Sequence, residues 1–524
     1  MTEKMLKFVK ISKENPVKRD TDDRKEDFKE IYKEFINEKA LQQSSRCSQC
    51  GVPFCQIHCP LSNNIPDWLK LTAEGRLKEA YYLSESTNNM PEVCGRICPQ
   101  DRLCEGNCVI EKSGHGTVTI GSIEKYITEN AWENGWIKPI KVDSEKSQSV
   151  GIIGAGPAGL ACAEELRKRG FKVTIYDRYD RAGGLLIYGI PNFKLEKFVV
   201  ERRTTLLKQS GIKFVQNFEV GKDSTLNDLK KKHDAILIAT GVYRAREINI
   251  PGNDLKNVFP AMDFLTASNK KGLGDKVDLF DNGTLNTKGK DVVVIGGGDT
   301  AMDCVRTAIR QSAKSVKCLY RRDKKNMPGS AREVTNAEDE GVKFIWLSSP
   351  KKILGINKAK GLVVDKIELG EPDESGRRKP IIKINSHFEV KSDLIIKALG
   401  FDPEEIPKLL QKLSDGFDVV YGYPEKEKHS LFRNLASIFT KMALKTAMGI
   451  ENAKHVSSYR AFNTVLRNAF KQYKGSFVSI DVLLSWGTNS FTAIPVGHDE
   501  RRIGKSNYTI RKLVQHALNM LTGF

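Results

Sequence analysis

Eight of the 11 cysteines of this 524-residue chain lie between Cys47 and Cys108, in two groups. The first group, "CSQCGVPFCQIHCP", has gaps of two, four and three residues between Cys47, Cys50, Cys55 and Cys59. The second, "CGRICPQDRLCEGNC", has gaps of three, five and three residues between Cys94, Cys98, Cys104 and Cys108. Closely spaced thiolates on turns are soft, anionic ligands of the kind that iron–sulfur clusters need. The pattern predicts iron–sulfur chemistry, and eight thiols suffice for two [4Fe–4S] clusters.

Two other uses of the thiols fit the pattern less well. Zinc sites usually show paired C-x2-C knuckles, and only Cys47 and Cys50 have that spacing. A secreted disulfide scaffold is short and follows a signal peptide, whereas this chain is long and starts with the charged stretch "MTEKMLKFVK". We therefore expect reduced thiols in a cytoplasmic protein.

The stretch "SVGIIGAGPAGLACAEELRKRGFKVTIYDR" (149–178) has the order strand, glycine turn, helix and strand. Gly154 permits a tight turn, Gly156 lets the backbone approach a pyrophosphate at the helix N-terminus, and Gly159 lets helix and strand pack closely. Asp177 stands 18 residues after Gly159, where a carboxylate can accept hydrogen bonds from ribose hydroxyls. Together these features predict a dinucleotide site.

A second unit of this kind is "DVVVIGGGDTAMDCVRTA" (291–308), whose three small residues are Gly296, Gly298 and Ala301. Its second strand, within "KSVKCLYRRD", ends in Arg321 and Arg322, where a ribose-binding acid would stand for NAD. Two guanidinium groups favour a 2′-phosphate. We therefore expect NADP(H) here; the alternative is that both are solvated surface arginines.

The segments around these motifs predict an α/β protein in four parts. Residues 21–46 show helical spacing, and residues 47–140 alternate short helical pieces with Cys, Pro and Gly turns. A polar linker then precedes the first glycine turn, and the glycine-turn pattern stops after Gly400. The expected parts are a helical iron–sulfur domain, two Rossmann-like dinucleotide-binding domains and a different C-terminal segment, at 1–145, 146–245, 246–400 and 401–524.

Composition excludes several classes of protein. The hydrophobic content of 40% and charged content of 28% are those of a soluble globular protein. The net charge of +19 is spread along the chain rather than gathered in one block, so we expect no nucleic acid partner. The sequence has no apolar run of the length, about 18 residues or more, that predicts a membrane span.

Over about residues 1–400, the two cysteine groups followed by the two glycine turns resemble the small (β) subunit of NADPH-dependent glutamate synthase and its relatives, including the N-terminal part of dihydropyrimidine dehydrogenases. The resemblance implies FAD in the first dinucleotide site, NADPH in the second, and two [4Fe–4S] clusters. It also implies electron flow from NADPH to a large (α) subunit, which makes glutamate from 2-oxoglutarate and glutamine. Hydride transfer between nicotinamide and flavin needs no side-chain acid or base, so we expect no catalytic residue.

The resemblance also implies individual roles. One cluster would use Cys47, Cys50, Cys55 and Cys108. The other would use Cys59, Cys98 and Cys104 with a fourth ligand, either Glu124 or Cys94, of which the resemblance slightly favours Glu124. The segment "RAGGLLIYGIPNFKLEK" (181–197) would surround the flavin through Gly184, Leu185 and Lys194. NADPH would be bound by Gly296, Gly298, Asp299, Thr300, Ala301, Arg321 and Arg322. The stretch "MPGSAREVTNAEDEGVKF" (327–344) continues the resemblance without an assigned role.

Residues 401–524 depart from that family. In the family, the chain here completes the FAD domain with an A-G-D-x-x-x-G-type segment that contacts the flavin, and 401–524 contain no such segment. Stretches such as "KHSLFRNLASIFTK", "SSYRAF", "DVLLSWG" and "RRIGKSNYTIRKLVQHALNMLTGF" instead resemble the C-terminal part of a family 2 glycosyltransferase. That resemblance implies a site near a donor diphosphate at Arg501, Gly504, Ser506 and Tyr508. We interpret the chain as a chimera whose junction lies within 401–410.

Alternatives remain open at this point. One is a related NADPH-dependent iron–sulfur oxidoreductase that serves ferredoxin or another acceptor. Another is an inactive chimera or glycosyltransferase fragment, because the donor-binding half of such a transferase is missing from the sequence. A third is that 401–524 form a divergent closing segment for the FAD domain.

Overall fold

The computed structural model describes residues 4–372, 377–401, 405–424, 455–457, 459–470 and 480–496. The chain divides into two compact units: unit 1 comprises 1–241 and 245–400, and unit 2 comprises 242–244 and 401–524. Within the described ranges, no helix is both long and apolar enough to cross a membrane. Two stretches of the glycosyltransferase resemblance, 428–441 and 501–524 with Arg501, Gly504, Ser506 and Tyr508, lie outside the described residues.

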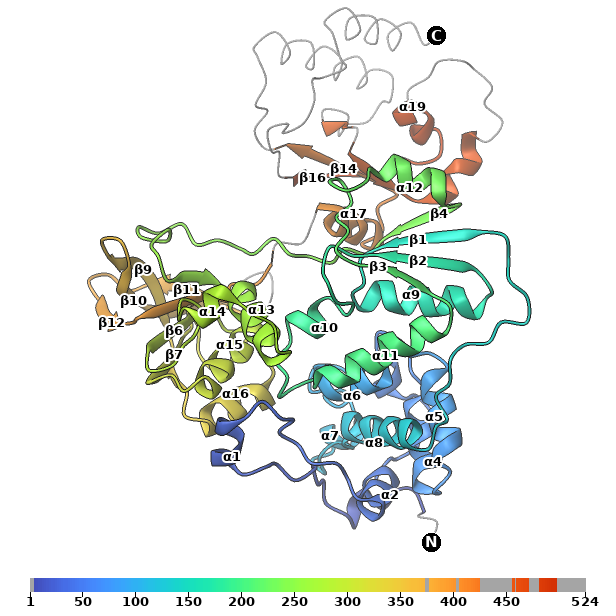
Figure 1. The fold of residues 1–524 in the computed structure, drawn as a ribbon, viewed down its shortest axis with the longest axis horizontal. Helices are drawn as coiled ribbons and strands as arrows, with labels where there is room; N and C mark the ends of the chain where they lie inside the picture. Colours follow the sequence, from blue (N-terminus) through green and yellow to red (C-terminus); the bar gives the residue numbers. More distant parts are fainter. Residues whose placement is uncertain are drawn as a thin grey trace, which may run out of the picture. The chain divides into compact units, whose positions relative to one another are not determined.

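The N-terminal part of unit 1 is helical (Figure 1). Its elements are η1 (Lys7–Val9), α1 (Thr21–Glu26), α2 (Asn37–Ser45), α3 (Phe54–Ile57), α4 (Ile65–Ala73), α5 (Leu77–Glu85), α6 (Pro91–Ile97), α7 (Val109–Lys112) and α8 (Ile120–Glu133). The apolar residues of α8 recur at helical spacing, so that Ile123 and Ile127 lie on one face. They pack against Trp68 of α4, and all three side chains are completely buried.

The expectation of helical structure over 21–46 is wrong for residues 27–36. Helices α1 and α2 are separated by an irregular, extended segment in which Tyr32 pairs with Lys18 in an antiparallel bridge. Asn192 Nδ2 donates to the Phe28 carbonyl (2.8 Å) and Asn336 Nδ2 to the Tyr32 hydroxyl (3.3 Å). Both donors come from distant parts of the chain. These tertiary contacts hold the segment extended, although its apolar residues have the spacing of a helix.

A four-stranded parallel sheet with the order β3-β2-β1-β4 follows. Its strands are β1 (Ser149–Ile153), β2 (Lys172–Tyr176), β3 (Lys213–Val215) and β4 (Ala235–Ile238), and its helices are α9 (Pro157–Lys168), α10 (Leu185–Tyr188), α11 (Lys197–Gln209) and α12 (Leu226–Lys232). The first glycine turn joins β1 to α9, at the carboxyl end of β1, as the sequence predicts. This is the edge of a parallel sheet at which dinucleotides bind.

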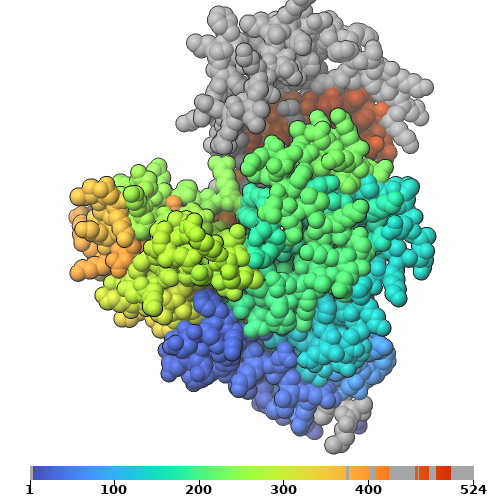
Figure 2. Space-filling model, viewed as in Figure 1, coloured from blue at the N-terminus to red at the C-terminus, as the bar shows by residue number. Residues whose placement is uncertain are grey.

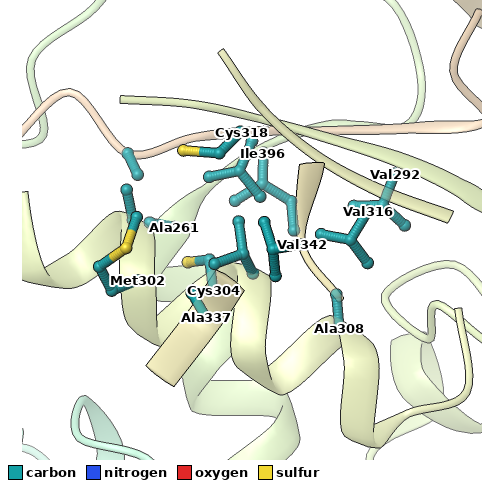
Figure 3. Close-up of a cluster of buried hydrophobic side chains, with 14 of the residues drawn as sticks. Ala261, Val292, Met302, Cys304, Ala308, Val316, Cys318, Ala337, Val342 and Ile396 are labelled. Atoms are coloured by element: carbon teal, nitrogen blue, oxygen red, sulfur yellow. The ribbon is translucent and has the colours of Figure 1, made fainter. Parts of the chain in front are cut away.

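A five-stranded parallel sheet with the order β5-β13-β6-β7-β8 forms the second half of unit 1. Its strands are β5 (Val258–Pro260), β6 (Asp291–Ile295), β7 (Ser315–Leu319), β8 (Lys343–Ile345) and β13 (Leu394–Lys397), and its helices are α13 (Ala261–Gly272), α14 (Asp278–Asp281), α15 (Asp299–Arg310) and α16 (Ala331–Asp339). Antiparallel strands β9 (Ser348–Gly355), β10 (Ala359–Pro372), β11 (Arg378–Ile382) and β12 (Phe388–Lys391) are inserted before β13. Figure 3 shows the core between sheet and helices, where Val292 lies beside Val316 and Ile396 beside Cys318, with Met302, Cys304 and Ala308 of α15 in the same cluster.

Buried ion pairs connect these parts. Glu92 of α6 receives two hydrogen bonds from Arg203 of α11, at 2.7 and 2.9 Å, and both side chains are buried. Arg24 of α1 reaches Glu340 at the end of α16, with 3.5 Å between Nη1 and Oε1. The space-filling view shows the corresponding contact, with blue N-terminal residues against yellow-green residues of the second sheet domain (Figure 2). Unit 1 is therefore held together by charges as well as by apolar cores.

Unit 2 contains a three-stranded sheet with the order β15-β14-β16. Its described elements are α17 (Glu405–Ser414), β14 (Val419–Pro424), β15 (Arg460–Phe462), η3 (Thr464–Phe470), α19 (Ile480–Ser485) and β16 (Phe491–Val496). The buried carboxylate of Asp481 accepts hydrogen bonds from the hydroxyl of Tyr421 (2.9 Å) and from Arg460. These contacts tie α19 to two strands of the sheet.

We expect Glu92→Gln to lower the free energy of unfolding by about 3 kcal/mol, because the buried guanidinium of Arg203 loses the carboxylate that accepts its hydrogen bonds and keeps only Glu164, 3.8 Å away. Thermal unfolding followed by circular dichroism would measure this as a Tm several degrees lower. Glu79→Gln is the control, because Glu79 pairs with Arg76 at the exposed surface and its loss should change the Tm little. Equal Tm values for the two variants would contradict the prediction.

Candidate cofactor sites

The three glycines of the first turn serve three different needs. Gly154 has φ +110°, and a Cβ there would lie 2.3 Å from the Ala239 carbonyl oxygen. A Cβ at Gly159 would lie 2.0 Å from the Gly154 carbonyl oxygen, so α9 can approach β1 only without a side chain. A Cβ at Gly156 would meet nothing within 4 Å. The space over Gly156, at the start of α9, therefore fits the phosphate groups of a dinucleotide.

Asp177 lies beside this turn, directly after β2. Its Oδ2 accepts a hydrogen bond from the backbone N–H of Ala155 (2.6 Å), and its Oδ1 accepts one from the N–H of Tyr179 (2.9 Å). The carboxylate is therefore fixed next to the glycine turn, at the position from which an acid in such folds contacts a ribose.

The segment after Asp177 is anchored to the same turn. The N–H of Gly183 donates to the Ala155 carbonyl (2.8 Å), and Gly184 starts α10 with φ +56°, a conformation suited to glycine. The buried ammonium of Lys197 donates to the carbonyl of Leu186 (3.0 Å) and to that of Ile190. Burial lowers the pKa of Lys197 to about 7. The backbone around Gly184 and Leu185 is thus held rigidly beside the first dinucleotide site.

Lys194 joins the two dinucleotide-binding halves. Its Nζ lies 2.8 Å from Oδ1 of Asp303 on α15 and 3.9 Å from Oε2 of Glu333 on α16. Burial opposes the charge of Lys194, but Asp303 and Glu333 outweigh it and raise the pKa of the ammonium. The sequence singled out Lys194 but not Asp303, because no local pattern marks a carboxylate on the buried side of α15.

The second turn repeats the geometry of the first. Gly296 has φ +148°, and a Cβ there would lie 2.1 Å from the Ala398 carbonyl oxygen, whereas a Cβ at Gly298 would meet nothing within 4 Å. Ala301 is completely buried, so its methyl group fits where the first turn needs a glycine. Asp299 and Thr300 begin α15, next to the open space over Gly298. This turn can therefore also receive a pyrophosphate.

Arg321 and Arg322 follow β7, where the sequence places the ribose-binding position. The structure separates the pair: Arg321 is exposed, whereas Arg322 is buried and its Nε donates to the Arg378 carbonyl (2.7 Å). Arg322 therefore also joins β7 to the antiparallel strands.

Cys108 lies near Cys47, Cys50 and Cys55. Burial raises the pKa of Cys55 to about 12, and the neighbouring thiolates of Cys47, Cys108 and Cys50 add to the effect. Burial likewise raises the pKa of Cys47 to about 11, again with Cys108 and Cys50 nearby. These four thiols, which come from both cysteine groups of the sequence, are therefore neighbours in space.

The other thiols gather around Glu124 of α8. Burial raises the pKa of Cys104, and the charges of Glu124 and Cys59 contribute. A hydrogen bond with Cys98 raises the pKa of Cys94. Burial and Cys94 together raise the pKa of Glu124, whose Oε1 accepts a hydrogen bond from Asn88 Nδ2 (3.0 Å). Both candidate fourth ligands, Cys94 and Glu124, are therefore present at this site.

All of these cysteines are free, and none forms a disulfide. Among the described residues, no three His, Cys, Asp or Glu side chains are already arranged as the shell of a single metal ion. Thiols are nevertheless the soft ligands that iron–sulfur clusters use.

Two families of known proteins match this chain, one over the cysteine-rich part and one over the glycine turns. Residues 24–136 match the family described as dihydropyrimidine dehydrogenase domain II, 4Fe-4S cluster. Residues 148–417 match the family described as pyridine nucleotide-disulphide oxidoreductase. The second match covers more than half of the chain, and the chain belongs to this class of oxidoreductases.

Individual relatives show to which family of these oxidoreductases the chain belongs. The chain is 62% identical over 405 residues to the glutamate synthase [NADPH] small chain of Azospirillum brasilense, covering 77% of this chain and 84% of the relative. It is 45% identical over 408 residues to the small chain of Escherichia coli, covering 78% and 86%. A solved structure, FprA of Mycobacterium tuberculosis with NADPH, is 20% identical with a TM-score of 0.44, covering 50% of this chain and 73% of that one. The chain belongs to the glutamate synthase small-chain family and is an oxidoreductase of that family.

We expect Gly156→Ala to fold but to bind FAD at least about tenfold more weakly, because the methyl group occupies the space that the phosphates need. Gly159→Ala should instead lower the Tm, because its Cβ meets the Gly154 carbonyl at 2.0 Å. Flavin titration and thermal unfolding of both variants separate the two effects. Wild-type affinity for FAD in Gly156→Ala would contradict this assignment of the turn.

Proposed function

We propose that this chain is the electron-input subunit of a glutamate synthase, which takes electrons from NADPH and passes them through FAD and two [4Fe–4S] clusters to a large (α) subunit that makes glutamate from 2-oxoglutarate and glutamine. The observation that carries the proposal is the presence, within one compact unit, of two thiol groups and two open glycine turns. The 62% identity to a glutamate synthase small chain supports the same role. Free thiols fit a reducing cytoplasm.

The residues of the chain would bind and orient these groups. Gly154, Gly156 and Gly159 with Asp177 would hold the FAD phosphates and ribose, and Gly184, Leu185 and Lys194 would border its flavin. Gly296, Gly298, Asp299, Thr300, Ala301, Arg321 and Arg322 would hold NADPH. When bound, nicotinamide and flavin supply hydride chemistry, and the clusters supply single-electron transfer. The protein contributes positioning and the exclusion of water rather than an acid or a base.

For the thiols we propose that Cys47, Cys50, Cys55 and Cys108 hold one cluster and that Cys59, Cys98, Cys104 and Glu124 hold the other. Glu124 is supported by its burial among thiols, with only the Asn88 amide as a hydrogen-bond donor to its side chain in the described part of the chain. A carboxylate buried in this way is stabilised by a positively charged centre. Cys94 would then act as a neighbour that donates hydrogen bonds.

We expect Glu124→Ala to reduce the iron content from about eight to about four atoms per chain, because one of two [4Fe–4S] clusters loses a ligand. Cys94→Ala should retain about eight. Iron analysis and electron paramagnetic resonance of anaerobically prepared protein measure both, and Cys162→Ser, a half-buried thiol of α9, is the control. The reverse pattern, with iron lost only in Cys94→Ala, would make Cys94 the ligand.

The surface beside the first thiol group fits a protein partner. Five large apolar side chains around Cys50, Cys55 and Cys108 are between 39% and 59% exposed: Val52, Phe54, Ile57, Leu61 and Val109. Exposed apolar side chains that form a contiguous patch mark interaction surfaces, and these five lie close in sequence to the thiols. We propose that the large subunit docks here, where an electron would leave the first cluster.

We propose that residues 401–524 do not complete the FAD domain. Among the described residues β4 pairs only with β1, and Ile238 is 61% exposed. The compact unit that holds both glycine turns ends at Gly400, although the oxidoreductase match extends as far as residue 417. The unit boundary at Gly400 supports a change of origin within 401–410, after which we propose that the chain is related to a family 2 glycosyltransferase without carrying its activity.

We therefore expect purified full-length protein to contain iron at about eight atoms per chain but less than one FAD per chain, because the flavin lacks part of its usual cover. Added FAD should restore NADPH-driven reduction of an artificial acceptor, and the large subunit should then support glutamate formation. Absorption spectra with iron and flavin analysis provide the measurement. Failure to reduce the acceptor with saturating FAD would overturn the proposed function.

A further inference from the structure

The loop between Cys98 and Cys104 touches the second glycine turn, although the two are almost 200 residues apart in sequence. Nη2 of Arg102 lies 3.0 Å from Oδ2 of Asp299, the first residue of α15, and Nη1 donates to the Pro328 carbonyl (2.6 Å). Beside it, Oδ2 of Asp101 accepts hydrogen bonds from the Ser330 hydroxyl (3.2 Å) and from the N–H of Ala331 (3.3 Å). A loop with two thiols thus meets the start of α15 directly.

The stretch that begins "MPGS" at 327 supplies the other half of this contact. The N–H of Gly329 donates to the Gly297 carbonyl (2.9 Å), and a Cβ at Gly329 would lie 3.1 Å from that same oxygen. The N–H of Ser330 donates to Oδ1 of Asp299 (2.9 Å). The Pro328 carbonyl that receives Arg102 is therefore fixed on the glycine turn itself. This gives the stretch a role that the sequence did not indicate.

The charges at the turn favour a cation beside Asp299. Asp299 stands at the N-terminus of α15, beside the open space over Gly298, and a pyrophosphate there would bring further negative charge next to its carboxylate. The guanidinium of Arg102 neutralises Asp299 and is 48% exposed. A guanidinium carries five N–H groups in a fork that suits phosphate oxygens.

We propose that Arg102, although it belongs to the iron–sulfur part of the chain, is a dinucleotide-binding residue that contacts the pyrophosphate of NADPH. The inference rests on the proposed function, in which the turn at 296–301 binds NADPH. Because Arg102 lies between Cys98 and Cys104, occupancy of the NADPH site then acts directly on the loop that carries two thiols of the second group.

The test uses Arg102→Met in the full-length protein, with NADP⁺ and NAD⁺ as ligands. Both dissociation constants should rise about tenfold, the loss expected for one charge-assisted hydrogen bond. The preference for NADP⁺ over NAD⁺ should not change, because both contain the pyrophosphate. The inhibition constant of adenosine 2′-phosphate, which lacks the pyrophosphate, should stay the same. In acceptor reduction with added FAD, the KM for NADPH should rise while kcat changes little.

Arg76→Met is the matched control, because Arg76 is 50% exposed in the same helical part and its Nη1 lies 3.0 Å from a carboxylate oxygen of Glu74. Iron content and Tm establish that each variant is folded, and Arg102→Lys, which keeps the charge, should restore part of the affinity. Unchanged dissociation constants in Arg102→Met, or an equal loss in Arg76→Met or for adenosine 2′-phosphate, would overturn the inference. If the wild-type protein bound neither dinucleotide, the proposed function itself would fail.

Discussion

Ion pairs that cross from one part of unit 1 to another set the distances on which electron transfer depends. Glu92 and Arg203 join α6, the helix that carries Cys94, to α11 beside the four-stranded sheet, and both side chains are buried. Lys194 and Asp303 join the segment between α10 and α11 to α15. A buried charge without its partner costs several kcal/mol, so each pair resists separation of the surfaces it joins. The thiols and the two glycine turns are therefore fixed in one body.

The glycine turns were predictable because their causes are local. Gly154 and Gly296 must avoid the carbonyls of Ala239 and Ala398, and this requirement follows from a turn that leaves a parallel strand and enters a helix. The sequence around each turn carries all the information needed. The strands, the turns and the position of Asp177 accordingly lie where the sequence predicts them.

Other features were not predictable, because their partners are distant. Arg102 and Asp299 are 197 residues apart, and no spacing pattern links them. The segment between α1 and α2 has the apolar spacing of a helix, yet side chains from both sheet domains hold it extended. The grouping of Cys108 with Cys47, Cys50 and Cys55 likewise came from the family resemblance, since gaps along the chain do not show which thiols meet in space.

The two parallel sheets of unit 1 differ in how completely their strands are paired. β4 and β13 occupy equivalent places, each beside the strand that enters a glycine turn. β13 is also paired with β5, and all four of its residues are buried, whereas β4 has no second partner among the described residues and Ile238 stays 61% exposed. An exposed edge leaves backbone N–H and C=O groups available for pairing with another strand. In the proposed role, the glycines and Asp177 bind the dinucleotide end of FAD while β4 beside them remains an unpaired edge among the described residues, so we expect the affinity for FAD, rather than the assembly of the clusters, to depend on the C-terminal segment.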